Sequence, residues 1–234
     1  MFRMLLILTV IVSGSVGGYA QRPGEPNKFE QPHAVRLEKV RIRAQSIERF
    51  FSKLSLSYDI PVGLEVAAND DEFATYDVEV KNGSVEDLLN QFVKAHNQYT
   101  WATVDGVINV FPKDGYRDAA INELLTTEIP SFKIGKNTSC FKLVDLLLAT
   151  SEVKSKLEAI GLTQSGLNFS GGYFPQLGPR FTLEVTNMSV RSILNKVAKD
   201  SPLARMWATK KYGPESTFFI RLQAYHSDTV RDEN

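Results

Sequence analysis

The sequence predicts an α+β protein made of two tandem βαββαβ-type domains, each with helices packed on small mixed sheets. Two observations indicate this class. Strand-like and helix-like segments alternate along the chain, and one stretch of sequence recurs about 105 residues later. The composition agrees, because 43% hydrophobic and 23% charged residues are ordinary values for a packed chain of 234 residues. We therefore expect a folded protein with disorder confined to its ends.

The repeat aligns residues 76–94 with residues 181–199, and eight of these nineteen positions are identical. A Trp-Ala-Thr triplet recurs as well, at a spacing one residue longer, beginning at Trp101 and at Trp207. Two copies of one unit fit the length of the chain. We predict a signal peptide at 1–20, a flexible leader at 21–34, a first domain at 35–112, a linker at 113–128, a second domain at 129–223 and a tail at 224–234.

The first twenty residues have the pattern of a cleaved secretory signal peptide. A basic start precedes the apolar run 4–12, and Gly18 and Ala20 occupy the small positions that a signal peptidase requires. The apolar run is shorter than the roughly 20 residues that span a bilayer. We therefore predict cleavage between Ala20 and Gln21, a periplasmic or secreted location, and no stable membrane span after cleavage.

The mature chain is almost neutral. Loss of Arg3 leaves 26 basic against 27 acidic residues, a formal charge of about −1. This balance argues against a nucleic-acid partner, because affinity for nucleic acid comes largely from neutralised phosphates. The leader carries three prolines among polar residues, and this composition cannot bury enough apolar surface to become ordered.

The first copy is predicted to begin with a strand at 39–43, where charged and apolar side chains alternate. Residues 45–57 place apolar side chains on one helical face, which indicates a helix. Strands at 62–67 and 75–80 follow, separated by the acidic loop 69–72, which we expect to face water.

Ser84 is predicted to cap a second helix, which buries Val85 and the apolar residues that follow at helical spacing. Strands at 99–104 and 107–111 then flank Asp105-Gly106. This dipeptide is preferred in two-residue hairpins because both turn positions need positive φ.

The second copy repeats this order with longer loops. The predicted strands are 131–135, 167–170, 181–185, 205–209 and 218–222, the predicted helices are 141–149 and one that Ser189 caps, and the predicted long loops are 154–165, 171–179 and 210–216. Within the linker, residues 119–125 are expected to form a helical turn or two.

The segment from Val78 to Leu89 gives the repeat a recognisable pattern. A hydrophobic strand leads through Asn82-Gly83 and Ser84 to an amphipathic helix, and an extended segment upstream runs into Ala44-Gln45-Ser46-Ile47. This pattern, in the order strand, helix, strand, strand, helix and hairpin, resembles the short N-terminal (STN) domain of secretins and TonB-dependent receptors. The first copy resembles it best, and the second copy does so in its latter half.

The resemblance implies a compact α+β fold with helices between small sheets, an envelope location and contacts with other proteins. Members of the family carry this domain ahead of a pore ring or an outer-membrane barrel, and we expect neither in this chain.

Two basic groups and one aromatic loop are the candidate interaction sites. They consist of Lys39, Arg41 and Arg43 on the first strand, Arg205, Lys210 and Lys211 around the second hairpin, and Tyr173 and Phe174 in a glycine-rich loop. Either basic group suits an acidic partner, and alternatively it protects an exposed edge strand from aggregation. Exposed aromatic side chains often anchor contacts, although loop aromatics also pack down on their own domain.

No set of residues typical of catalysis stands out, and we predict no cofactor and no metal ion. Of the three histidines, His33 lies in the leader and His226 in the tail, whereas His96 is expected to end a helix and interact with its dipole. The single cysteine, Cys140, excludes an intramolecular disulfide and opens a predicted helix. It is either a reactive thiol or a small core residue.

Acidic residues also lack a pattern that indicates chemistry. The loop 69–72 has neither the alternate ligand spacing nor the glycine turn of a calcium loop. Glu79 and Glu184 occupy equivalent outward strand positions, so we expect a role in the fold or in surface pairing.

These observations favour a non-enzymatic protein-protein interaction module of the cell envelope, an accessory or adaptor that acts by edge-strand addition or by docking on its sheet and hairpin face. Its partner is expected to be an envelope protein. The alternative is a ligand-binding module for glycan or peptide that uses Trp101, Trp207, Tyr173 and Phe174. A hydrolase is the remote alternative, and it would need a deep polar pocket around His96 or Cys140.

Overall fold

The computed structural model describes residues 30–70, 74–165, 181–212 and 216–224. The first copy contains η1 (Pro32–Ala34), β1 (Arg36–Ala44), α1 (Ile47–Tyr58), β2 (Val62–Glu65), β3 (Tyr76–Ser84), α2 (Val85–Ala95), β4 (Tyr99–Val104) and β5 (Val107–Pro112). The linker and second copy contain α3 (Ala119–Thr126), β6 (Glu128–Ile134), α4 (Cys140–Leu148), α5 (Ser151–Ile160), β7 (Thr163–Gln164), β8 (Leu183–Ser189), α6 (Val190–Asp200), β9 (Ala204–Tyr212) and β10 (Thr217–Ala224). These helices and mixed sheets confirm the predicted α+β class.

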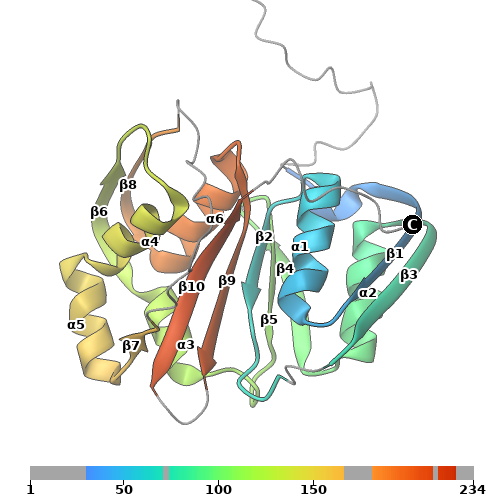
Figure 1. Ribbon diagram of the computed structural model, residues 1–234, viewed down its shortest axis with the longest axis horizontal. Coiled ribbons are helices and arrows are strands. Elements are labelled where there is room, and N and C mark those ends of the chain that lie inside the picture. The colour runs from blue at the N-terminus through green and yellow to red at the C-terminus, as the bar shows by residue number, and fades with distance from the viewer. Residues whose placement is uncertain (1–29, 71–73, 166–180, 213–215, 225–234) are drawn as a thin grey trace, which may run out of the picture.

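The molecule is layered around a six-stranded sheet with the order β4-β5-β2-β9-β10-β7. On one side, α1 and α2 lie between this sheet and the antiparallel ribbon β1–β3 (Figure 1). On the other side, α4 and α6 lie between the sheet and the ribbon β6–β8. Each copy therefore contributes one ribbon, two enclosed helices and three strands of the central sheet.

Local capping explains why the two best-predicted helices begin where they do. Ser84 Oγ accepts a hydrogen bond from the backbone N–H of Asp87 at 3.2 Å, and the Asp87 carboxylate accepts one from the backbone N–H of Ser84 at 2.8 Å. Ser189 caps α6 through its own hydroxyl. Two residues before each cap, Asn82 and Asn187 have positive φ angles of 52° and 50°, which asparagine adopts more readily than most residues.

The first hairpin also forms as the sequence predicts. Asp105 and Gly106 join β4 to β5 with positive φ angles of 55° and 78°. α2 contacts β4, and its buried stripe consists of Val85, Leu88, Leu89 and Phe92.

The predicted loop 154–165 is wrong, because α5 covers its first part and β7 its end. Val153 is the fully buried residue of α5, while Leu157 and Ile160 are only partly buried against the core. The apolar stripe is therefore narrow, which explains why periodicity did not indicate a helix. Gly161, with a φ of 65°, ends α5. The predicted strand 167–170 and loop 171–179 lie outside the described residues.

The two copies share one sheet because β2 pairs in parallel with β9. The register runs from Val62 opposite Met206 to Glu65 opposite Thr209. Met206 and Ala208 of β9 belong to the hydrophobic core of the first copy. The linker is likewise packed, since α3 contains the predicted helical turns and contacts α5, α6 and β9. The sequence predicted the two copies but not this contact between them.

The predicted signal peptide, most of the leader and the tail lie outside the described residues. Among the helices in the described part of the chain, none combines the length and apolar character needed to cross a membrane.

Candidate interaction surfaces

The contact between β2 and β9 places a tryptophan over a glycine. Trp207 is fully buried, and its Nε1 donates a hydrogen bond to Asn195 Oδ1 of α6 at 2.7 Å. Gly63 lies opposite Trp207 in the register, and a Cβ atom there would be 2.6 Å from the indole ring. A glycine at this position therefore allows the two strands and the ring to approach as closely as they do.

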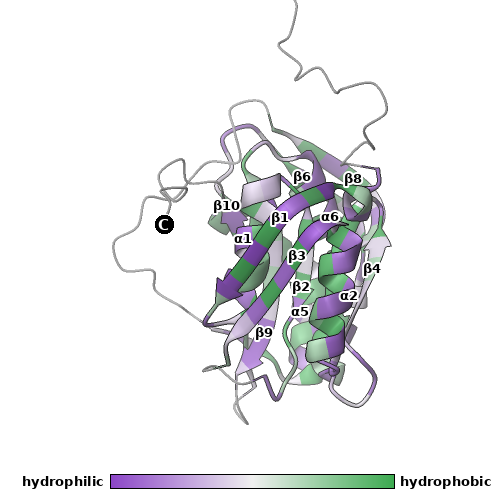
Figure 2. Cartoon of the chain, turned by 90° about the vertical axis from the view of Figure 1, so that its right-hand side faces the viewer, coloured by the Kyte–Doolittle hydropathy of each residue, from purple (hydrophilic) through white to green (hydrophobic). Residues whose placement is uncertain are grey.

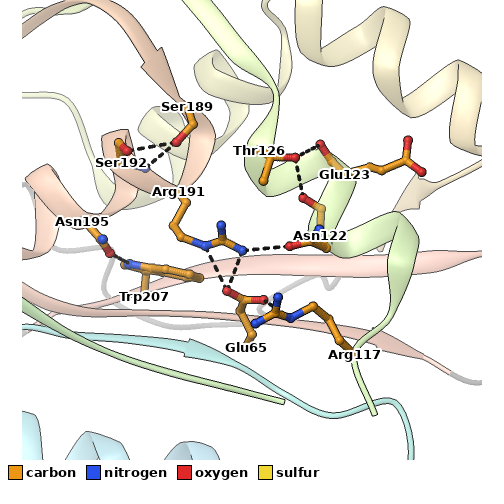
Figure 3. A network of polar contacts seen from close by, with 10 residues as sticks. All are labelled: Glu65, Arg117, Asn122, Glu123, Thr126, Ser189, Arg191, Ser192, Asn195 and Trp207. Carbon is orange, nitrogen blue, oxygen red and sulfur yellow. Dashed lines mark hydrogen bonds and ion pairs between the residues drawn. The ribbon is translucent and has the colours of Figure 1, made fainter. Parts of the chain in front are cut away.

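A buried carboxylate lies beside this pair (Figure 3). The Glu65 side chain is only 4% exposed, and its Oε1 accepts a hydrogen bond from Arg191 Nε of α6 at 3.0 Å and forms an ion pair with Arg191 Nη2 at 2.8 Å. Arg191 also donates to Asn122 of α3 at 3.3 Å. Arg117 Nε lies 3.9 Å from Glu65 Oε2, which is an ion pair without a hydrogen bond. Because Glu65 and Arg191 come from different copies, this cluster fixes one copy against the other.

β4 is the first-copy equivalent of β9, and its outer edge pairs with no strand in the part of the chain that the structure describes. The tryptophan-asparagine pair recurs here, because Trp101 Nε1 donates to Asn90 Oδ1 of α2 at 3.1 Å. Trp101 is half-buried and Asn90 exposed, whereas Trp207 and Asn195 are both buried. Figure 2 shows β4 at the margin of the molecule, next to α2. The first copy therefore leaves the edge of β4 open, whereas the equivalent edge of β9 in the second copy is covered by β2.

The predicted basic residues of the first strand lie on the outer face of ribbon β1–β3. Lys39, Arg41 and Arg43 are exposed and alternate with buried side chains (Figure 2). Arg41 donates two hydrogen bonds to Asp77 of β3, at 2.9 and 2.7 Å, and these lower the pKa of the Asp77 carboxyl. Glu79 lies opposite Arg41 in the register. This face therefore mixes basic and acidic side chains.

The two equivalent glutamates pair on the surface, in agreement with the prediction. Glu79 lies 3.1 Å from Lys81, and Glu184 lies 2.7 Å from Lys133. Both glutamates are exposed, so each pair contributes little to stability.

Arg205 lies inside the molecule and not on an exposed hairpin. It is 9% exposed, and its Nε donates to Asp59 Oδ1 at 2.6 Å. Its Nη1 donates to the backbone carbonyl of Lys199 at 2.7 Å. Arg205 therefore connects the end of α1 with the end of α6.

Lys210 and Lys211 lie on β9, which extends to Tyr212 and replaces part of the predicted loop 210–216. Lys210 is 9% exposed, with its ammonium 5.8 Å from the centre of the Tyr212 ring. Lys211 forms an ion pair with Asp118 at 3.2 Å. These lysines and Arg205 therefore do not form the exposed basic cluster that we expected, because β9 is a central strand whose residues 204–210 are buried on both faces.

The aromatic candidates have different outcomes. Tyr173 and Phe174 lie outside the described residues. Trp207 is enclosed between the copies, so it cannot contact a ligand, and Trp101 remains partly accessible. This burial weakens the alternative of an aromatic glycan or peptide site that uses both tryptophans.

His96 ends α2, as predicted, and its ring packs between two aromatic side chains. The ring centres are 4.6 Å from Tyr76 and 4.8 Å from Phe92. Burial lowers the pKa of His96, and this effect is larger than the opposing effect of the nearby Asp70 carboxylate.

Cys140 is the first residue of α4 and is 3% exposed. Burial raises the pKa of its thiol to about 11. A reactive cysteine needs a lowered pKa and access to solvent, so the structure favours the core role of the two that the sequence left open.

The acidic loop provides an internal contact that sequence reasoning missed. Asp70 Oδ1 accepts hydrogen bonds from the hydroxyls of Tyr76 at 2.7 Å and Tyr99 at 2.8 Å. The Tyr99 hydroxyl also accepts one from the backbone N–H of Ala67 at 3.0 Å, and burial raises the pKa of Tyr99. Asp70 is therefore not a simple solvated loop residue, and the two tyrosines in nearby strand-like segments were the only available signal.

A polar depression of about 240 Å³ lies beside α6 and near the tip of the first hairpin. Both lysines that line it are engaged, because Lys196 pairs with Asp200 at 2.8 Å and Lys199 donates to the backbone carbonyl of Asp105 at 2.9 Å. Among the described residues, no three His, Cys, Asp or Glu side chains are grouped as metal ligands.

Comparison of the chain with protein-family models, curated proteins and solved structures gave no match.

Proposed function

We propose that this chain is a non-enzymatic protein-binding module of the cell envelope, which holds an envelope protein by strand addition. The observation that carries the proposal is the open edge of β4 beside Trp101 and Asn90. The chain already joins its own copies by adding β2 to β9. An unpaired strand edge offers the same backbone groups to an extended segment of another protein.

The sequence supports the location and the class of partner. The pattern of residues 1–20 is that of a signal peptide, and the repeat resembles a domain that makes protein contacts in the envelope. In this proposal the mature chain begins at Gln21 and acts as an accessory or adaptor of a secretin-like or TonB-receptor-like assembly.

Photo-crosslinking in the source cell tests this function. A photoreactive amino acid is placed singly at Val104 on the β4 edge, at Lys39 on ribbon β1–β3 and at Lys211 on β9. The control position is Leu146 on α4, which is similarly exposed to Val104, at 39% against 41%. We expect reproducible adducts with an envelope protein from one or more strand positions and none from Leu146.

Two results would contradict the proposal. One is the absence of protein adducts at all three strand positions, and co-purification of a small ligand would then favour the ligand-binding alternative. The other is a chain that remains in the cytoplasm and that mass spectrometry shows to retain residues 1–20.

A further inference from the structure

The internal repeat allows the missing neighbour of β4 to be deduced from the neighbour that β9 has. In the first copy β5 pairs antiparallel with β4 and parallel with β2, and in the second copy β10 pairs antiparallel with β9 and parallel with β7. The two half-sheets are therefore equivalent strand by strand. β9 carries a further parallel strand, β2, on its outer edge, whereas β4 carries none among the described residues.

The side chains that form the β2–β9 contact recur at β4 in a more exposed state. Met206, Trp207, Ala208 and Thr209 of β9 are all fully buried, whereas their equivalents Thr100, Trp101, Ala102 and Thr103 in β4 are all half-buried. The indole of Trp101 is held by Asn90 as that of Trp207 is held by Asn195. Trp101 in the first copy is therefore held in the same way as Trp207, the ring that packs on Gly63.

The segment before β1 lies next to Trp101 and Thr103 of β4, and the equivalent segment of the second copy is compatible with an added strand. η1 packs on α2 and β5, and His33 Nδ1 lies 3.1 Å from Thr103 Oγ1. The counterpart of η1 in the second copy is α3, because equivalent hydrogen bonds follow the two helices. The residue after η1, Val35, accepts a hydrogen bond from the backbone N–H of Val85. The residue after α3, Thr127, accepts one from the backbone N–H of Val190. α3 packs on α6 and β9 while β2 still pairs with β9.

The charge at the site differs between the copies, and this difference specifies the ligand. In the second copy Arg191, the second residue of α6, binds Glu65, which lies two residues after Gly63 in the incoming strand. The equivalent second residue of α2 is Glu86, which is exposed. An incoming strand at β4 therefore meets a carboxylate where β2 meets a guanidinium.

We propose that the outer edge of β4 binds an extended segment of a partner protein that runs parallel to β4, with a glycine opposite Trp101 and a lysine or arginine two residues later, opposite Thr103 and facing Glu86. This inference rests on the proposed function and specifies its partner. The glycine leaves room for the indole ring, and the basic residue restores the ion pair that Arg191 and Glu65 form in the second copy.

Synthetic peptides derived from β2 test the inference on the full mature chain. The probe is the sequence of residues 60–67 with lysine in place of Glu65, labelled for fluorescence anisotropy. The comparison peptides keep Glu65, or carry lysine together with Gly63→Val. We expect the lysine peptide to bind about two- to fivefold more tightly than the glutamate peptide, which is the range of a surface ion pair. The valine peptide is expected to lose detectable binding.

Two protein variants locate the site. Glu86→Arg changes an exposed side chain, so the fold is retained, and the preference between lysine and glutamate peptides should reverse. Trp101→Ala should abolish binding of the lysine peptide, with unchanged circular dichroism showing that the chain is folded. Binding that persists in Trp101→Ala, or a preference that Glu86→Arg does not reverse, would overturn the inference.

The remaining outcomes separate this inference from the proposed function. Self-association that excludes the peptide and disappears in Trp101→Ala would identify a second copy of the chain as the occupant and would overturn the inference. No peptide binding, together with cellular crosslinks at Lys39 or Lys211 only, would also overturn it while leaving the proposed function intact. Loss of crosslinks at every strand position would contradict the proposed function itself.

Discussion

Gly63 sets the distance between the two copies through the side chain that it lacks. A Cβ atom there would lie 2.6–2.7 Å from three atoms of the Trp207 indole, and the hydrogen bond to Asn195 limits how far the ring can move. We expect Gly63→Ala to lower the free energy of unfolding by about 1–3 kcal/mol, the usual cost of overpacking. Urea unfolding of the two proteins measures the difference.

Gly135 provides the matched control, because nothing lies within 4 Å of a Cβ atom built there and its φ is not positive. Gly135→Ala should be neutral or slightly stabilising, since alanine restricts the unfolded chain. Equal losses in the two variants would show that Gly63 has no special contact with Trp207.

The sequence alone could not predict that Trp101 and Trp207 have different environments. The repeat identified these residues as equivalent, and it also identified the Asn90 and Asn195 that hold them. Their burial differs because β2 covers one and not the other, and that pairing joins residues far apart in the chain. Sequence periodicity reports only local structure, so it cannot show which strand edge another strand will cover.

Elements with strong local signals were predicted closely. The Ser84 capping box and the broad apolar stripe specify α2, and the Asp105-Gly106 turn specifies the hairpin β4–β5. α5 was missed because its buried stripe is narrow. Among the candidate site residues, those on β1 share one exposed face, as the sequence predicted, but Arg205 and Lys210 are buried because β9 is a central strand covered on both faces.

At the scale of elements, Glu65 on β2 and Arg191 on α6 connect the two copies. Arg191→Met should lower the free energy of unfolding by about 3–5 kcal/mol, because it leaves a buried carboxylate with Arg117 as its nearest cation, 3.9 Å away. The double variant with Glu65→Leu should lose less than Arg191→Met alone, because no unpaired charge remains. Urea unfolding of both variants gives the comparison.

The exposed pair of Lys133 and Glu184, which also connects two elements, serves as the reference. Its side chains are 69% and 67% exposed, so Lys133→Met should change the free energy of unfolding by no more than about 0.5 kcal/mol. If Arg191→Met costs as little as Lys133→Met, the buried cluster does not hold the copies together.

At the scale of the whole molecule, the shared sheet determines whether the two copies unfold together. Each copy has its own hydrophobic core, which by itself would permit separate unfolding. However, Met206 and Ala208 of the second copy complete the core of the first, and β2 covers Trp207 of the second. Opening the contact between β2 and β9 would expose apolar side chains from both cores, so we expect a single cooperative transition.

The two tryptophans allow this to be measured copy by copy. Trp207→Phe leaves Trp101 as the fluorescent reporter of the first copy, and Trp101→Phe leaves Trp207 as the reporter of the second. Within each variant, the urea transition followed by fluorescence should coincide with that followed by far-ultraviolet circular dichroism, which reports helices of both copies. A fluorescence midpoint that differs from the circular dichroism midpoint would mean that one copy unfolds while the other stays folded. The contact between β2 and β9 would then be weaker than either core, and strand addition at the equivalent edge of β4 would be correspondingly weak.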